Sequence, residues 1–392
     1  MPEFIKELES ESRLNSKDQK NDGLGYVSYS VGPYSPYFAG PLKINFQLDG
    51  EVIVKAEVER GFAHKGLESL IENRRWEQII PLVSRLDLES SCYGELVFCL
   101  AIERLLELEI PKRAKLIRVV ICELTRIACH LKFFSQVAQS VEAPTVVHYL
   151  LRDREKILDL FELLTGSRFS LSLFKVGGVT TDTTEGFLDR VMALTDLIQY
   201  RIKEYNDVFS FNYGFLRRSC GIGVLSQEVA NSFGVTGSNL RASGMRYDVR
   251  KFRPYSAYDE LEFSLPLGQG EYGIQGDCND RYLVRLRELT ESIQLIRQSC
   301  QAIRPGDCDS GFKIQDFQSV PAGEVYEEVE SPRGTLGCLI QSSGQLGPRG
   351  FRFNVPSLGH IQALEEILVG ERMENVALIT SSMGISIPEL DR

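Results

Sequence analysis

The chain has 392 residues, of which 43% are hydrophobic and 25% are charged, and its formal net charge is −10. This composition is that of a folded protein with two or three packed subdomains, and it excludes a disordered chain. The acidic balance, without a Lys- and Arg-rich run, argues against nucleic acid as a partner. No apolar run approaches the roughly 18 residues that a membrane-spanning helix needs, so we expect any membrane attachment to depend on another protein.

The N-terminal region is predicted to hold a mobile tail followed by a β-hairpin. Residues 1–25 are polar, of mixed charge and without the apolar stretch of a signal peptide, so we expect a mobile tail there. In the region 26–66, apolar and polar residues alternate on both sides of Asp49-Gly50, a dipeptide that favours a two-residue hairpin turn. The residues expected to share the inward face are Leu42, Ile44, Phe46, Leu48, Val52, Val54, Ala56 and Val58.

Residues 67–320 are predicted to form a bundle of long helices with inserted loops. Antiparallel packing is the natural way for such helices to bury their apolar stripes. Asp280 is the expected N-cap of the last helix, and the Gly- and Tyr-rich range 211–276 is typical of loops. Apolar residues at steps of three and four favour helices over 67–73, 88–106, 112–138, 146–165, 185–209 and 281–303.

The C-terminal region, residues 321–392, returns to strand-like segments. Alternating or β-branched runs favour strands over 325–329, 336–342 and 350–355, and a helix is expected over 360–368. The fold class that follows is α+β, with a central bundle of long helices and a small α/β region formed by both ends of the chain.

The nine cysteines do not indicate a disulfide framework or a metal site. Their number is odd, and no Cys-x-x-Cys pair occurs. No set of four ligands has the spacing of a zinc or iron–sulfur site. We therefore interpret the cysteines as packing thiols in a reducing compartment, and we expect this chain to bind no metal.

One predicted helix, over 112–138, carries a charged stripe. Glu123, Arg126 and His130 share one face of this helix, and Arg118 lies on a neighbouring face. Two interpretations remain open. The stripe is either a solvated face, or it contacts a partner subunit or belongs to a buried polar network.

No self-contained active site is evident. The string from Gly268 to Gly273 matches Gly-x-Gly-x-x-Gly, but it opens no helix and lies in no βαβ pattern, so it does not predict a nucleotide site. The four histidines are scattered along the chain. A chain of this size that lacks a set of reactive residues of its own is more typical of a subunit that forms an active site together with partner proteins.

Several runs resemble the D-type core subunit, also called the 49 kDa type, of NADH:quinone oxidoreductase (respiratory complex I). The specific matches are the runs 240–260 and 280–285. The resemblance also includes Gly61–Glu68, Arg85-Leu86-Asp87 and the terminal Asp391-Arg392, whereas the short glycine matches, such as Gly177-Gly178, are weak. The resemblance covers roughly residues 26–392. It implies the fold of the nickel–iron hydrogenase large subunit, to which this family is related.

The resemblance implies a place in a membrane-associated complex. The expected partners are a small subunit of the B type, which holds a [4Fe–4S] cluster, subunits of the C and I types, and a membrane subunit of the H type. Quinone is the expected substrate, reduced in a chamber between this chain and the cluster-bearing subunit. The implied location is peripheral, on the cytoplasmic side of a bacterial inner membrane or the matrix side of the mitochondrial one. The positions implied to lie near the cluster or at a subunit interface are His64, Lys65, Arg85, Arg118, Glu123, Arg126 and His130.

The expected quinone-chamber positions depart from the family pattern. Ser35 and Ala39 stand where the family has histidines, Leu88 stands where it has tyrosine, and Ser140 stands where it has aspartate. Ser170 replaces a further histidine near the cluster. The complete set of implied chamber positions is Ser35, Pro36, Ala39, Gly40, Asp87, Leu88 and Ser140.

Three functions remain open. The first is a complex I core subunit with a divergent site for the quinone headgroup. The second is a redox-silent scaffold that holds other subunits together. The third is a complex I-like enzyme with another electron acceptor. A nickel–iron site is not expected, because the resemblance places Asp87, Ser90, Ser386 and Glu389 where that site has cysteines, and hard oxygen ligands do not replace thiolates there.

Overall fold

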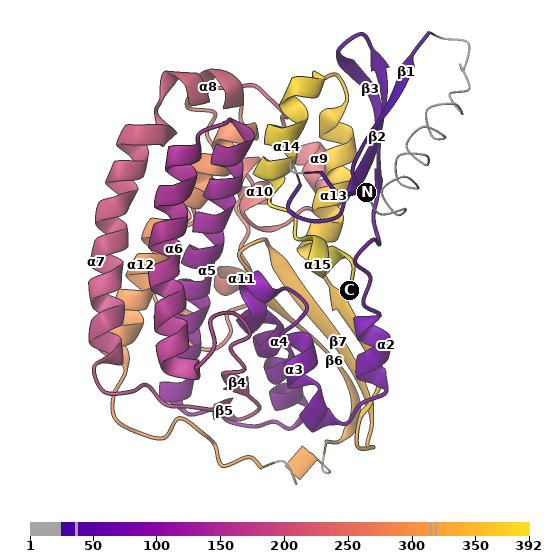
Figure 1. The fold of residues 1–392 in the computed structure, drawn as a ribbon. Helices are drawn as coiled ribbons and strands as arrows, with labels where there is room; N and C mark the ends of the chain where they lie inside the picture. Colours follow the sequence, from indigo (N-terminus) through magenta and orange to yellow (C-terminus); the bar gives the residue numbers. More distant parts are fainter. Residues whose placement is uncertain (1–24, 36–37, 314–315, 318–319) are drawn as a thin grey trace, which may run out of the picture.

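The computed structural model describes residues 25–35, 38–313, 316–317 and 320–392. Four long helices stand side by side on one side of the molecule (Figure 1), and α5 contacts both α6 and α12, while α7 also contacts both. This is the predicted bundle, with ends displaced by a few residues. The four helices are α5 (Lys112–Ser140), α6 (Pro144–Thr165), α7 (Phe187–Tyr205) and α12 (Cys278–Ala302).

Helix α5 lies at the centre of the packing. Its apolar residues recur at steps of three and four, and the helix begins after Pro111, which has no backbone N–H to lose. Neighbours cover it on several sides, including α4 (Ser91–Leu105) and α14 (Val376–Met383). Both its apolar face and its charged stripe are therefore buried, except near its two ends.

Helix α12 begins three residues earlier than predicted. Its N-cap is Asp277, whose carboxylate accepts a hydrogen bond from the backbone N–H of Asp280 at 2.8 Å. The prediction of Asp280 as the cap was wrong. Asp280 lies in the first turn, where its carboxylate accepts from the backbone N–H groups of Gly270 (2.9 Å) and Gly276 (3.2 Å) and so fixes the preceding loop.

The predicted hairpin is present as β2 (Lys43–Asp49) and β3 (Val52–Glu59), and β1 (Val27–Val31) adds a third antiparallel strand. The inward face of β3 differs from the prediction. Val52 and Val54 are exposed, and Ile53 is buried. The reason is a register shift at Gln47/Leu48, which exchanges the two faces of the strand beyond it.

The two ends of the chain meet, as predicted. Figure 1 shows the N-terminal strands beside the C-terminal helices, and β3 packs against α13 (Pro356–Leu368). The backbone N–H groups of Gly61 and Ala63 each donate to the Asp391 carboxylate at 2.9 Å. The terminal strands form an antiparallel meander that packs against α4: β6 (Ala322–Glu330), β7 (Thr335–Ser343) and β8 (Pro348–Asn354).

The range 211–276 contains short helices where the sequence predicted loops. Three of them begin at Asn, Ser or Asp side chains that accept a backbone N–H, which is a local signal that the composition had hidden. These helices are α8 (Tyr213–Ser219), α9 (Gln227–Ser232), α10 (Gly237–Ala242) and α11 (Val249–Phe252). The remaining short elements are α2 (Leu67–Glu72), α3 (Ile80–Val83), α15 (Ile387–Leu390), β4 (Phe174–Lys175), β5 (Gly178–Val179), η1 (Trp76–Gln78), η2 (Leu88–Ser90), η3 (Asn206–Ser210), η4 (Tyr258–Glu260) and η6 (Met373–Asn375).

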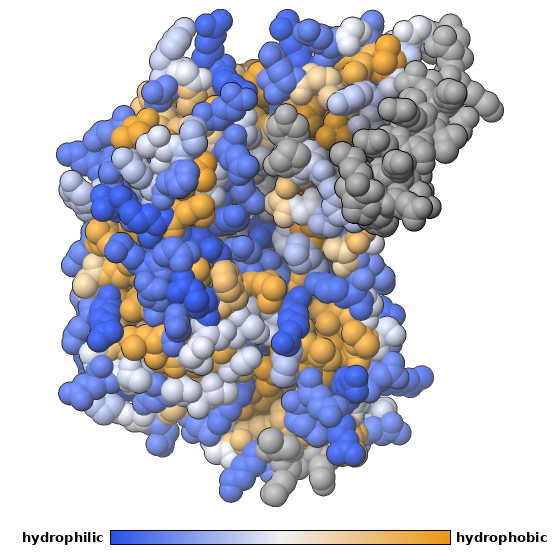
Figure 2. Space-filling model, in the orientation of Figure 1, coloured by the Kyte–Doolittle hydropathy of each residue, from blue (hydrophilic) through white to orange (hydrophobic). Residues whose placement is uncertain are grey.

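The surface in the view of Figure 2 mixes hydrophilic and hydrophobic side chains over both the bundle and the sheets. In the part of the chain that the structure describes, no helix combines the length and the apolar character needed to cross a membrane.

Candidate functional site

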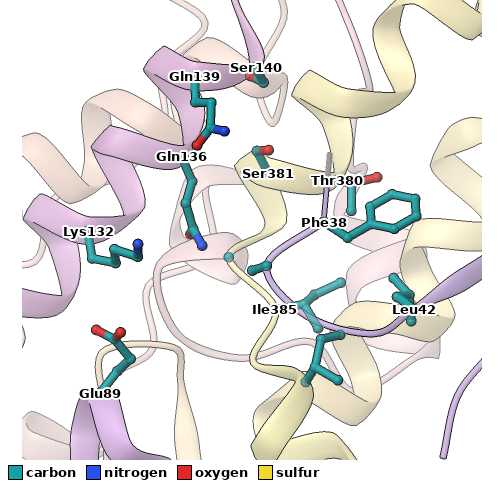
Figure 3. A pocket seen from close by; sticks show the side chains of 13 residues that line it. Phe38, Leu42, Glu89, Lys132, Gln136, Gln139, Ser140, Thr380, Ser381 and Ile385 are labelled. Carbon is teal, nitrogen blue, oxygen red and sulfur yellow. The ribbon is translucent and has the colours of Figure 1, made fainter. Parts of the chain in front are cut away.

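A two-part cavity lies between the C-terminal half of α5, the loop before β2, and the C-terminal segment from α14 to α15. Its larger part has a volume of about 500 Å³ (Figure 3), and the smaller part has about 250 Å³. Both parts share walls made by Ala39, Glu89, Lys132, Gln136, Gly384, Ile385 and Ile387. Segments far apart in the sequence thus meet around one space.

Four of the predicted chamber positions line this cavity. Ala39 borders both parts, Ser140 borders the larger part, and Asp87 and Leu88 border the smaller part. Gly40 lies against the same wall, because a Cβ atom at this position would meet the side chain of Ile387 at 3.0 Å. The structure therefore brings together residues from three segments.

Among the described chamber positions, Ser35 is not a lining residue. The backbone carbonyl of Ser35 accepts from the N–H of Phe38 at 3.3 Å, within the loop that leads to Ala39. Pro36 lies outside the described residues. Ser140 does line the cavity, but its hydroxyl donates within its own helix, to the carbonyl of Val137 at 2.7 Å.

Asp87 and Arg333, at the edge of the smaller part, are paired with each other. Arg333 donates to the Asp87 carboxylate at 2.8 Å, and Asp87 also accepts from Ser90 at 2.7 Å. Nearby Glu389 is buried and accepts from the backbone N–H of Ser357. Burial raises the pKa of Glu389 to about 7, with Arg333 opposing this effect and Asp87 adding to it.

His64, Lys65 and Arg85 lie outside the cavity. His64 and Lys65 are exposed, and the Lys65 ammonium donates to the carbonyls of Arg85, Leu86 and Pro388, which joins the loop before η2 to the C-terminal segment. Desolvation of this ammonium lowers the pKa of Lys65, although Asp87, Asp391 and Glu389 act in the opposite direction. Arg85 donates to the carbonyl of Pro81 at 2.7 Å.

The charged stripe of α5 is a buried network. Glu123 accepts from Arg126 at 3.1 Å and from Arg250 at 3.0 Å, and it also accepts from Tyr258 and Ser292, both at 2.7 Å. Burial alone would raise the pKa of Glu123, but the two arginines and the two hydroxyl donors lower it to about 2.

Two interpretations of that stripe are corrected by its burial. Arg118, Glu123 and Arg126 are at most 1% exposed, so they form neither a solvated face nor a surface that a partner can contact. Arg118 pairs with Glu103 at 2.6 Å and donates to the carbonyl of Gly178. Of the predicted interface positions, those that are exposed on this chain are His64, Lys65 and Arg85.

His130 links the network to the cavity. It borders the smaller part, and its Nε2 forms a hydrogen bond with the Glu288 carboxylate at 2.9 Å. Glu288 also accepts from Arg241 and Ser238. Burial lowers the pKa of His130 to about 4, against the opposing effect of Glu288. His130 is therefore a neutral hydrogen-bonding side chain at neutral pH.

The sequence interpretation missed several polar residues of the cavity wall. On α5, Lys132, Gln136 and Gln139 follow one another at steps of four and three, the spacing of one helix face. Glu89, Arg285, Arg333, Thr380 and Ser386 also border the cavity. The α5 spacing was readable in the sequence, but the wall that faces it comes from the C-terminal segment and only the fold reveals it.

The side chains of the described residues offer no metal-binding geometry around this space. Among residues 25–35, 38–313, 316–317 and 320–392, no group of three or more His, Cys, Asp or Glu side chains is arranged to hold a metal ion. Every cysteine in the described chain is a free thiol.

Comparison with known proteins gives consistent matches. The family model described as "Respiratory-chain NADH dehydrogenase, 49 Kd subunit" matches residues 141–314 and 310–392. The D-type subunit of NADH-quinone oxidoreductase from Desulforamulus reducens is 38% identical over 362 residues, covering 92% of this chain and 97% of the relative. The corresponding protein of Carboxydothermus hydrogenoformans is also 38% identical, over 93% of this chain and 98% of its own length. That of Campylobacter curvus is 34% identical over 96% and 97%.

Proposed function

Because the chain belongs to the family of the 49 kDa subunit of respiratory-chain NADH dehydrogenase, we propose that it is a core subunit of an NADH:quinone oxidoreductase. In this role it forms one wall of the chamber where electrons reach quinone. The observation that carries the proposal is the two-part cavity, where Ala39, Leu88 and Ser140 come together from separate segments. These are positions that the family resemblance assigns to the quinone.

The headgroup site is divergent. Ala39 and Leu88 have no side-chain donor, and the Ser140 hydroxyl is used within α5. The donors to the quinone oxygens therefore have to come from other residues of the wall. The volume of the larger part, about 500 Å³, falls in the range typical of small-molecule sites.

The proposed assembly is peripheral to a membrane. A small subunit of the B type, carrying the [4Fe–4S] cluster that donates electrons, faces the cavity and the exposed His64 and Lys65. Subunits of the C and I types and a membrane subunit of the H type complete the surroundings. The chain adopts the fold of the nickel–iron hydrogenase large subunit, with Asp87 and Ser90 hydrogen-bonded to each other where that enzyme has its first pair of cysteines.

A redox-silent scaffold is the second candidate. The loss of side-chain donors at Ala39 and Leu88 is the observation that favours it. A complex I-like enzyme that reduces an acceptor other than quinone is the third, and it shares the same observation.

The test is NADH-driven reduction of a short-chain quinone analogue by the purified complex. We expect reduction, and we expect the double variant Ala39→His with Leu88→Tyr to increase its rate, since it restores two donors at the cavity wall. NADH oxidation by ferricyanide, an artificial acceptor, serves as the control for intact electron input.

The outcomes separate the three candidates. If ferricyanide is reduced while neither the native complex nor the double variant reduces any quinone analogue, the quinone proposal is wrong. Turnover with a different physiological acceptor would then identify the third candidate, and a complex without acceptor reduction near this chain would identify the scaffold.

A further inference from the structure

Polar groups without partners line the cavity. In the described chain, neither the Lys132 ammonium nor the Gln136 amide forms a hydrogen bond or an ion pair. The hydroxyl oxygens of Thr380 and Ser386, both buried and both on the opposite wall, also lack a partner there. Lys132 and Gln136 are half-buried, whereas Thr380 and Ser386 are buried. Buried polar groups are normally satisfied, so the two unsatisfied hydroxyls indicate that a polar ligand or water fills the space beside them.

The nearby carboxylates do not neutralise Lys132. Glu89, the acidic residue labelled on this wall in Figure 3, already accepts from Arg154 at 2.6 Å. Asp87 is occupied by Arg333. The wall therefore holds a lysine whose charge is not committed to a carboxylate of the described chain.

A second cationic side chain, Arg285, adds to the positive charge of Lys132 at the cavity wall. Arg285 borders the smaller part of the cavity, and within the described residues it donates to uncharged oxygens, among them the side-chain carbonyl of Asn239 at 2.8 Å. Burial is the main reason that the pKa of Arg285 falls to about 9; neighbouring arginines act in the same direction, and Glu288 acts in the opposite direction. A buried space with uncompensated positive charge favours an electron-rich oxygen.

Lys132 and Gln136 are placed to act together. They stand four residues apart on α5, so their Cβ atoms are neighbours on one helix face, about 5–6 Å apart. Figure 3 shows both side chains extending from α5 into the space that the C-terminal segment borders on the other side. A carbonyl oxygen accepts two hydrogen bonds, so both donors can converge on one oxygen.

We propose that Lys132 and Gln136 hold a carbonyl oxygen of the quinone headgroup in this cavity, in place of the donors that Ala39 and Leu88 lack. This inference rests on the proposed function and names the residues that hold the quinone headgroup. The bond from a lysine ammonium strengthens as its acceptor becomes more negative. Since the quinone oxygen gains negative charge on reduction, Lys132 contributes more to turnover than to initial binding.

The experiment compares two lysines of the same helix in the assembled complex. Lys132→Met is expected to lower kcat/KM for a short-chain quinone analogue at least ten-fold, with most of the loss in kcat. Lys132→Arg, which keeps a charged donor, is expected to stay within a few-fold of the native rate. Gln136→Leu is expected to cause a smaller loss than Lys132→Met, because it removes a neutral donor.

Lys115→Met is the matched control. Lys115 is also half-buried on α5, but it lies 17 residues before Lys132, roughly 25 Å away along the helix axis at 1.5 Å per residue. We expect native quinone reduction in this variant. Ferricyanide reduction and subunit composition should be unchanged in all variants, which separates a local effect from a failure to assemble.

Direct binding of the analogue to the complex, measured without NADH, separates this inference from the proposed function. Quinone reduction by the native complex with unchanged kcat/KM in Lys132→Met overturns the role of Lys132 and leaves the proposed function intact. If the native complex binds the analogue without reducing it and Lys132→Met weakens that binding, the proposed function fails while the site is supported. Absence of both binding and reduction in the native complex overturns both.

Discussion

The two halves of α5 carry polar side chains in opposite situations. In the first half, Glu123 and Arg126 are fully buried, and each is bonded to several groups of the same chain. In the second half, Lys132 and Gln136 face a cavity and have no partner among the described residues. The difference teaches how to separate a polar group that holds the fold from one that is available to a ligand. Burial and partners differ together here: Glu123 and Arg126 are fully buried and bonded, whereas Lys132 and Gln136 are half-buried beside a cavity and have no partner in the described chain.

The partners in the first half come from distant parts of the chain. Arg250 bonds both Glu123 and Asp248, and Arg241 bonds Glu288 at 2.7 Å and Glu330 at 2.8 Å. These contacts tie α5 to α10, α11, α12 and β6. Removing one member leaves the opposite charges buried without compensation, which is costly even where the intact pair contributes little.

The largest expected effect is therefore at Glu123. Glu123→Gln keeps the shape but leaves Arg126 and Arg250 without their shared carboxylate, so we expect a loss of about 3–5 kcal/mol in unfolding free energy. Chemical unfolding of the purified protein measures it. Glu57→Gln, at an exposed pair with Lys55, is the control and should not change stability measurably. Equal stability of the two variants would show that the network does not hold the fold.

Glu389 is buried close to Arg333 and Asp87, which border the cavity, and both of them act on its pKa. Its folded-state pKa of about 7 lies above the value near 4.3 expected for an unfolded chain. Between these values the folded state binds more protons than the unfolded state, so stability falls as pH rises from about 4 to 7. The stabilising contribution of the protonated group is complete below the unfolded pKa.

Glu389→Gln should remove this dependence. We expect the variant to gain about 3 kcal/mol relative to the native protein as pH is raised from 4 to 8, since each pKa unit corresponds to about 1.4 kcal/mol. The unfolding free energies of both proteins are measured across this pH range, and the value for the native protein is subtracted from that for the variant. The subtraction removes the pH dependence that both proteins share, such as the contribution of His130. A difference that stays constant with pH would mean that Glu389 is ionised in the fold and belongs with the fully compensated charges.

The sequence predicted the elements whose periodicity reflects local chemistry. The long helices, the hairpin at Asp49-Gly50 and the terminal strands were found because their apolar residues repeat at the period of the element. Val52 and Val54 were misplaced because a bulge breaks that period. The family motif also located Ala39, Leu88 and Ser140, which the fold then brings to one cavity.

The roles of the polar residues on α5 could not be predicted in the same way. Glu123 and Lys132 occur in the same helix and are both charged, yet only Glu123 has partners among the described residues. Those partners, Tyr258 and Ser292, are 135 and 169 residues away in the sequence. Which polar residue is compensated depends on tertiary contacts, and the helical pattern does not encode them.

The smallest expected change in stability concerns two buried threonines, one with hydrogen-bond partners in the described chain and one without. Thr125 donates to the carbonyl of Ile121 at 2.8 Å and accepts from the Cys92 thiol at 3.3 Å, whereas the Thr380 hydroxyl has no partner in the described part of the chain. Thr125→Val should cost about 1 kcal/mol in unfolding free energy, because it breaks satisfied hydrogen bonds. Thr380→Val should leave stability unchanged or raise it by up to about 1 kcal/mol, because it removes a polar group that the folded chain does not compensate. Chemical unfolding of both variants without added ligand decides the matter. An equal loss in both would mean that the Thr380 hydroxyl is compensated within the fold, and the unpaired hydroxyl on the α14 side of the cavity would then no longer point to a ligand.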